Sequence, residues 1–208
     1  MSPLGTNGMS DKPSPSILRG GPMTKGVAVL LGVIIVLSLV SFLSYMQMRD
    51  YHDAKYRAQY WIVSDMISEM KEVSNGLHNY TLDGVTNEQR NQSEPVLSAM
   101  LIHLGSSSRY LAAMYYDDHE KRDVFGHVSY AFSYVEERLH YYDLGWTLSY
   151  WKAKLDGCAS NISALAVEFE KGVDPSRNAI DEPYSLVNRM DLDEINRIAV
   201  FMAPRIFY

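Results

Sequence analysis

The sequence has almost no cysteine, since Cys158 is the single one among 208 residues. One cysteine cannot form an intramolecular disulfide, and it cannot supply the paired ligands of a cysteine zinc site. The ordinary role of such a residue is that of a small buried apolar side chain, and the alternative is a disulfide to another chain. The fold is therefore expected to form without a disulfide framework or a cysteine zinc site.

The chain also lacks the short motifs of several enzyme classes. It has no Gly-rich phosphate-binding loop, no Gly-x-Ser-x-Gly sequence, and no motif around Cys158 that is typical of a nucleophile. Alternation of apolar and polar residues never extends beyond a few positions, which argues against a sheet-based fold. We therefore expect an all-α, non-enzymatic protein that binds no cofactor.

Positive charge is scarce over most of the chain. The protein carries 25 acidic and 19 basic residues, a formal net charge of -6. Residues 1–25 hold one acidic and three basic residues, so the part after residue 47 holds the other 24 acidic and 16 basic ones. Because nucleic acids are bound by basic surfaces, the charge balance excludes them as the expected partner.

What the sequence does contain is a long uncharged apolar stretch, residues 26–47. It reads GVAVLLGVIIVLSLVSFLSYMQ, without charge or proline. About 20 apolar residues, rising about 1.5 Å each, cross the hydrocarbon core of a bilayer, which is about 30 Å thick. The stretch predicts a single transmembrane helix that serves as a signal anchor.

The segments on either side of this stretch predict its orientation. Residues 1–25 are rich in Pro, Gly and Ser without an apolar period, which is typical of a disordered tail. Basic residues stay cytoplasmic, and Lys25 lies on the tail side. Arg49, Lys55 and Arg57 on the other side weaken this asymmetry. We expect a cytoplasmic tail, a cell-membrane anchor at 26–47 and an extracytoplasmic domain at 48–208.

Two other interpretations of residues 26–47 remain open. A cleaved signal peptide needs a small-x-small site after its apolar run, and the pair that fits, Val36 and Ser38, lies inside the run. A prepilin-like signal has charged residues and a glycine before the apolar helix. Lys25 and Gly26 match that pattern only in part.

Four series of apolar residues after the anchor recur at steps of three and four, which is the period of packed, coiled-coil-like helices. The first series continues the anchor without an intervening helix stop. The four series are Tyr56, Tyr60, Val63, Ile67, Met70 and Leu77; Leu97, Leu101, Leu104, Ser108, Leu111 and Tyr115; Val128, Phe132, Val135, Leu139, Tyr142 and Trp146; Trp151, Leu155, Cys158, Ile162, Leu165 and Phe169.

The expected helix ends come from capping signals. Asn75-Gly76 predicts that the first helix ends near Ser74. Thr86 and Gln89 have the spacing of a capping box for the second helix, and Ser93-Glu94-Pro95 is a competing start.

The third and fourth series are out of register, which requires a break near Gly145, with Gly157 as the rival. A break at Gly145 makes four helices of similar length. Together with the anchor, they predict a transmembrane helix that continues into an up-down four-helix bundle with short C-terminal helices.

The C-terminal part is punctuated by Pro175, Pro183 and Pro204. Acidic residues at 191, 193 and 194 predict a helix start. Ile195, Ile198, Ala199 and Met202 then form one apolar face. Since four alternating helices return the chain to its starting side, residues 195–208 are expected at the membrane face. The alternative, which the sequence leaves equally open, is that this apolar face caps the end of the bundle.

Metal binding is the one chemical alternative that the sequence raises. Glu137-x-x-His140 has the spacing of half a di-iron site, but no second Glu-x-x-His sequence exists. His127, four residues after Asp123, and His140, four after Glu136, could add ligands, with His119 and Glu120 nearby. Surface ion pairs on a helix have the same spacing. An ordinary solvated helix face is therefore expected, without a metal ligand or catalytic residue.

Tyrosine is unusually abundant, with 15 residues. Tyr130, Tyr134 and Tyr141 lie off the third apolar series at helical spacing, on about one face. Such rings bury a large area at low entropic cost, so we interpret these three as candidate partner-binding residues. The alternative is a wide bundle face whose hydroxyl groups reach water.

Three asparagines, Asn79, Asn91 and Asn161, stand in Asn-x-Ser/Thr triplets, compatible with an extracytoplasmic domain. The expected architecture is similar in outline to bundle-type sensory domains of membrane receptors, although those have a second membrane helix and a signalling module.

We expect a non-enzymatic accessory, structural or partner-binding subunit that contacts the bilayer and either an envelope or membrane protein or itself. The first alternative is a ligand-sensing domain that signals through a partner. The second is a helical oxidoreductase with metal ligands His127, Glu137 and His140.

Overall fold

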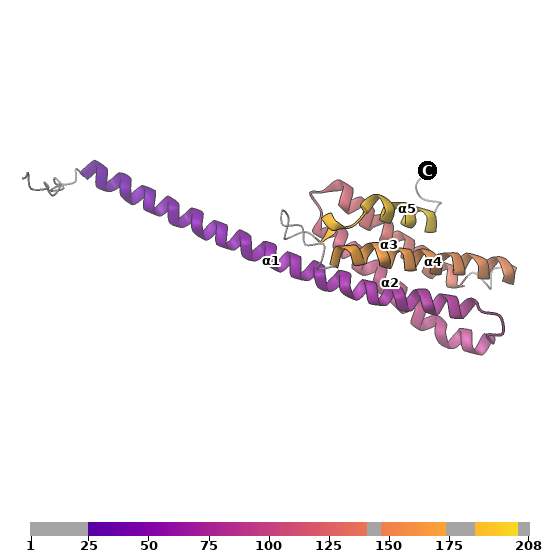
Figure 1. The fold of residues 1–208 in the computed structure, drawn as a ribbon. Helices are drawn as coiled ribbons and strands as arrows, with labels where there is room; N and C mark the ends of the chain where they lie inside the picture. Colours follow the sequence, from indigo (N-terminus) through magenta and orange to yellow (C-terminus); the bar gives the residue numbers. More distant parts are fainter. Residues whose placement is uncertain (1–24, 141–146, 174–185, 204–208) are drawn as a thin grey trace, which may run out of the picture. The chain divides into compact units, whose positions relative to one another are not determined.

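The computed structural model describes residues 25–140, 147–173 and 186–203, and all regular structure in these ranges is helical (Figure 1). The all-α prediction is confirmed, and the chain divides into two compact units, residues 1–48 and 49–208. The predicted tail, apart from Lys25, lies outside the described residues. The elements are α1 (Lys25–Thr81), α2 (Asn87–Met114), α3 (His119–Leu139), α4 (Leu148–Val173), the 3-10 turn η3 (Val187–Arg189) and α5 (Leu192–Met202).

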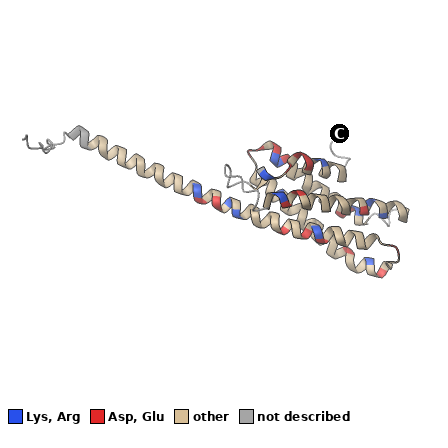
Figure 2. Ribbon diagram, viewed as in Figure 1, with Lys and Arg blue, Asp and Glu red and all other residues tan. Residues whose placement is uncertain are grey.

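The described part of the first unit is the beginning of α1. Among the described residues, α1 is the one helix long and apolar enough to cross a membrane. Its large apolar side chains from position 29 to position 43 are each at least 40% exposed. Figure 2 shows this stretch of α1 without a charged residue, and charges begin at Arg49. The helix therefore has the length and surface that a bilayer span requires.

The core of the second unit consists of the faces that the apolar series predict. Every member of the second and fourth series is buried, and so are Val128, Phe132, Val135 and Leu139 of the third. Tyr142 and Trp146 lie outside the described residues. In the first series Tyr60 is exposed, whereas Met66 and Val73, which the series omits, are fully buried. The buried face of α1 is therefore wider than a single seam.

Helix α1 ends at Thr81, not near Ser74 as the Asn75-Gly76 signal predicts. The helix continues because Leu77 and Tyr80 extend its buried face beyond the glycine. A Cβ at Gly76 would lie 2.5 Å from Leu97 Cδ2, so this glycine allows α2 to approach closely. The chain instead turns at Gly84, whose φ of 91° suits a residue without a Cβ.

The predicted capping box at the start of α2 is confirmed. The backbone N–H of Gln89 donates to Thr86 Oγ1 at 3.2 Å, and the Thr86 N–H donates to Gln89 Oε1 at 2.9 Å. The competing start at Ser93-Glu94-Pro95 is wrong, because Pro95 lies inside the helix.

Helix α3 ends at Leu139 and α4 begins at Leu148, so the break lies between the third and fourth apolar series, as their difference in register predicts. The rival break at Gly157 is wrong, because α4 continues through this residue. Gly145 itself lies outside the described residues.

Helices that contact each other in the second unit are antiparallel, as the order of their contacting residues shows. Residue numbers fall on one helix as they rise on its neighbour, so each helix runs opposite to the next. The contacts are Glu69–His103 and Tyr80–Glu94 between α1 and α2, Ser98–Glu136 and Gly105–Ser129 between α2 and α3, Phe125–Phe169 and Arg138–Trp151 between α3 and α4, and Ser74–Ala159 and His78–Asp156 between α1 and α4.

Helix α5 begins as the acidic residues predict, with Asp191 as its N-cap, and its predicted apolar face is buried. The expectation that residues 195–208 lie at the membrane face stays a prediction. Helix α5 begins beside the start of α3, where Glu120 and Asp191 line one cleft. His127 contacts Asn196, and Tyr134 lines a groove with Phe201, so α5 runs in the same direction as α3. Since the start of α3 lies at the end of the unit that holds Lys55, α5 runs away from that end.

Candidate functional site

One of the predicted tyrosines, Tyr134, lines a groove of about 380 Å³ between α3, α4 and α5. We call it the Tyr134 groove. Because the three helices are distant in sequence, only the fold brings its lining residues together. These are Tyr134 and Arg138 from α3, Ala153, Lys154, Gly157, Cys158 and Asn161 from α4, and Phe201 and Met202 from α5.

The α3 wall of the groove is an aromatic and cationic row. Tyr134 belongs to this wall, while Tyr130, whose ring lies 6.5 Å from that of Tyr134, does not line the groove; both side chains are half-buried against the core. The Arg138 guanidinium lies over the Tyr134 ring, 4.4 Å from its centroid, and donates to the Tyr134 hydroxyl oxygen. Stacking of this kind orients the cation without neutralising it. Tyr141, the third predicted partner-binding residue, lies outside the described residues.

Apart from Lys154, the α4 wall is made of small or medium-sized side chains. A Cβ at Gly157 would meet no atom within 4 Å, so the groove stays open at this position. Asn161 donates to the Gly157 carbonyl oxygen at 2.8 Å and extends the wall by one turn.

Cys158 lies at the base of the Tyr134 groove, where it is buried as expected. Burial raises its pKa to about 11, although Arg138 and Lys154 act in the opposite direction. The thiol is therefore neutral at physiological pH, which argues against a nucleophilic role.

Phe201 completes the groove from α5. Its side chain is 71% exposed, while its neighbour Met202 is buried. The charged side chains that line the groove, Arg138 and Lys154, are both positive, in a unit of net negative charge. An apolar trough with an exposed ring and two cations suits a segment that carries apolar and acidic side chains.

The structure separates the residues of the metal hypothesis. His127 Nδ1 lies 2.7 Å from Asn196 Oδ1, and His127 is 13 positions before His140 along α3. His140 contacts Glu94 Oε1 at 2.7 Å and Glu136 Oε1 at 3.2 Å, while Glu137 is exposed. No group of three His, Cys, Asp or Glu side chains in the described parts of the chain is arranged to hold a metal ion.

Sequence reasoning missed the contact between His140 and Glu94. These residues are 46 positions apart on α3 and α2, so helical spacing gives no signal for the pair. Burial lowers the pKa of His140, but hydrogen bonds to Glu136 and Glu94 outweigh burial and raise it above its usual value near 6.5.

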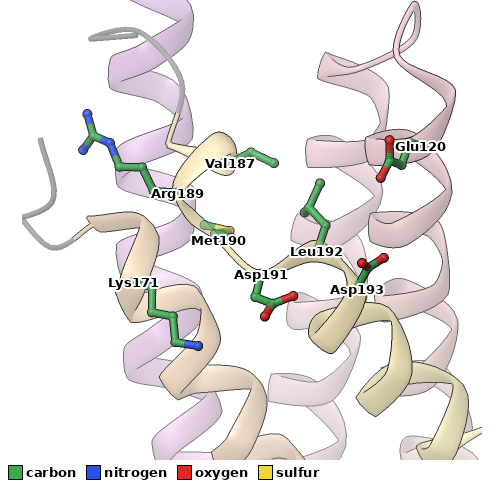
Figure 3. A pocket seen from close by; sticks show the side chains of 8 residues that line it. All are labelled: Glu120, Lys171, Val187, Arg189, Met190, Asp191, Leu192 and Asp193. Carbon is green, nitrogen blue, oxygen red and sulfur yellow. The ribbon is translucent and has the colours of Figure 1, made fainter. Parts of the chain in front are cut away.

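A wider cleft of about 630 Å³ lies where η3 leads into α5 (Figure 3). Figure 3 shows Arg189 on the opposite side of this cleft from Glu120 and Asp193. Two of its charged groups already have structural partners: Asp191 caps α5 through Glu194 N–H at 3.0 Å, and Lys171 pairs with Glu168. These two groups therefore have structural roles at the cleft.

The geometry thus defines a class: an all-helical protein with one long apolar N-terminal helix and a groove of mixed apolar and cationic lining. No family model matches the chain, and searches of curated proteins and of solved structures find no match either. Any functional assignment therefore rests on the chain's own residues.

Proposed function

We propose that this protein is a single-pass membrane protein whose second unit binds another protein outside the cell membrane, as a non-enzymatic accessory subunit. The proposed anchor is residues 26–47, with the preceding tail in the cytoplasm. Its support is the uncharged, outward-facing apolar surface of α1, together with Lys25 on the tail side.

The proposed form of the second unit is an up-down four-helix bundle of α1–α4, with η3 and α5 packed onto it. The opposite order of contacts around the cycle α1–α2–α3–α4–α1 supports this architecture. Helix α5 packs against α3 and α4, where it completes the Tyr134 groove. A rigid helical scaffold keeps such a groove in shape without a bound partner.

The observation that carries the partner assignment is the Tyr134 groove itself. It combines an exposed aromatic ring, Phe201, with a stacked pair, Tyr134 and Arg138, and tyrosine and arginine are enriched at the centres of interfaces. The partner segment is expected to be apolar with acidic side chains, because the charged residues that line the groove are both cations. The partner is an envelope or membrane protein, or a second copy of this chain.

Photocrosslinking in native membranes tests this proposal. A benzophenone amino acid replaces Phe201 in the full-length chain, and a second variant carries it at Tyr116, which is equally exposed at 72% but does not line the groove. We expect a discrete crosslinked product from position 201 and none from position 116, with the attached protein identified by mass spectrometry.

A second pair of variants links that product to the groove. Gly157→Gln fills the groove, while Gly126→Gln adds the same side chain in open space on α3. We expect Gly157→Gln to reduce crosslinking from position 201 at least about tenfold, a loss of about 1.4 kcal/mol in binding. Equal products from positions 201 and 116, or a product unaffected by Gly157→Gln, would contradict the proposal.

A second candidate function is ligand sensing through a partner. It is favoured by a separate polar cavity beside the turn between α1 and α2, whose lining residues differ from those of the Tyr134 groove. The two functions are compatible, because a bundle can hold a ligand at one place and a partner at another.

A further inference from the structure

The cavity in question has a volume of about 300 Å³ and lies where α1 ends, α2 begins, α3 ends and α4 begins. We call it the Arg90 cavity. That volume is at the lower end of the range for small-molecule sites, so it suits a compact metabolite. Its lining residues are Tyr80, Asn87, Arg90, Asn91, Glu94, Leu139, His140 and Trp151.

Arg90 provides the positive side of the cavity. Its Nε donates to the Tyr80 carbonyl oxygen at 3.2 Å, and its Nη1 donates to Asn87 Oδ1 at 3.3 Å. These bonds hold the guanidinium about 6.0 Å from the centroid of the Trp151 ring. Among the described residues, Nη2 makes no hydrogen bond, so a cation held in place keeps an unused donor.

Glu94 provides the negative side, one helical turn from Arg90. Its Oε2 accepts from the Tyr80 hydroxyl at 3.1 Å, and its Oε1 lies 2.7 Å from His140 Nδ1. A carboxylate has about four acceptor positions, so these two contacts leave capacity for a third donor. His140 Nε2 faces Glu136 at 3.2 Å, and Ser98 donates to the same Glu136 oxygen at 2.7 Å.

The two charges do not neutralise each other. Residues four apart on a helix ordinarily form an ion pair, yet Arg90 is bonded to Tyr80 and Asn87, and Glu94 to Tyr80 and His140. Asn91 lies on the lining beside them, and so do the buried residues Tyr80 and Trp151, whose rings are 5.4 Å apart. The cavity is therefore lined by a cation and an anion, and each keeps hydrogen-bonding capacity that its protein partners do not use.

We propose that the Arg90 cavity binds a small zwitterion of the α-amino acid class. The ligand carboxylate is bound by the Arg90 guanidinium with help from the amides of Asn87 and Asn91, and the ligand ammonium is bound by Glu94. A simple anion would meet the Glu94 carboxylate, and a simple cation would meet Arg90, so each alone is disfavoured. This inference gives a ligand class to the sensing function and does not depend on the Tyr134 groove.

Isothermal titration of the full-length protein in nanodiscs tests the assignment, with the 20 common L-amino acids as probes, each at up to about 10 mM. Butyrate and butylamine, which carry one charge each, are the matched controls. We expect at least one amino acid to bind with a Kd between about 1 μM and about 1 mM, and both controls to bind at least about tenfold more weakly.

Variants then assign the binding to this cavity. Arg90→Gln and Glu94→Gln should each raise the Kd for the amino acid at least about tenfold. Glu88→Gln, a change at an exposed residue in the same turn, should leave the Kd unchanged. Asn91→Asp alters an exposed side chain at the cavity and should weaken binding without a change in fold, so the test stands if Arg90→Gln unfolds.

Two results would overturn the inference: no heat from any amino acid, or binding that persists in Arg90→Gln and Asn91→Asp. Crosslinking at position 201 does not involve this cavity, so failure here and failure of the partner proposal are separate results.

Discussion

Leu101 and Ile102 are adjacent residues of α2 with opposite surroundings. Leu101 is fully buried, while Ile102 is 56% exposed. Leu101→Ala should lower the free energy of unfolding of the protein by about 2 to 5 kcal/mol, because it removes buried methyl groups and leaves a cavity. Ile102→Ala should change it by less than about 0.5 kcal/mol. Chemical denaturation measures both, and equal losses would show that the buried face of α2 is misassigned.

His140 gives the second unit a pH dependence of stability. Its folded-state pKa is raised above about 6.5, so the ion pairs with Glu94 and Glu136 contribute fully below that pH and are lost as pH rises through the folded pKa. Stability should therefore fall over the pH range that begins at about 6.5 and extends upward through the folded-state pKa. His140→Gln should flatten this slope in denaturation curves taken across that range. A slope identical to that of the unchanged protein would rule out the pairing.

At the scale of elements, glycines report how closely helices approach. A Cβ at Gly172 of α4 would overlap Met190 Cε and lie 3.1 Å from the Leu186 carbonyl oxygen, whereas one at Gly126 of α3 would meet no atom within 4 Å. Gly172→Ala should lower the melting temperature, with a cost of about 1 to 3 kcal/mol. Gly126→Ala should stabilise by about 0.5 to 1 kcal/mol, because alanine favours a helix interior. Stabilisation by both would mean that η3 does not pack on α4.

Helix α1 illustrates how elements depart from local signals. Asn75-Gly76 is a normal helix stop, yet the helix continues because Leu77 and Tyr80 bury apolar surface beyond it. Burial of two large side chains contributes several kcal/mol, compared with about 1 kcal/mol for a glycine in a helix. Pro95 inside α2 is the same case, since Leu97 and Leu101 hold the helix on the core.

At the scale of the whole molecule, the orientation in the membrane is the main prediction. If the second unit is extracytoplasmic, protease added to intact cells should remove residues 48–208 and leave a tag at the N-terminus protected. The control is permeabilised cells, where both parts should be digested. Protection of the second unit in intact cells would reverse the assignment.

Much of the architecture could be predicted from the sequence alone, because local patterns encode it. Every residue that the apolar period assigned to the cores of α2 and α4 is buried, although the period missed Ala159 and Ala166 of α4. Thr86 and Gln89 identified a helix start to the residue. Composition and the uncharged stretch 26–47 identified the helical class and the helix that can span a membrane. These features depend on residues within one or two turns of each other, so the chain order itself carries them.

Only the tertiary structure decided where side chains from different helices meet. The Tyr134 groove needs Gly157 and Phe201 beside Tyr134, and the Arg90 cavity needs His140 beside Glu94, across separations that no helical period reports. The structure also decided the course of the C-terminal segment, because η3 packs on the end of α4 and the buried face of α5 then packs along α3. Packing energy is summed over the whole core, so it overrides local stops and places distant residues together.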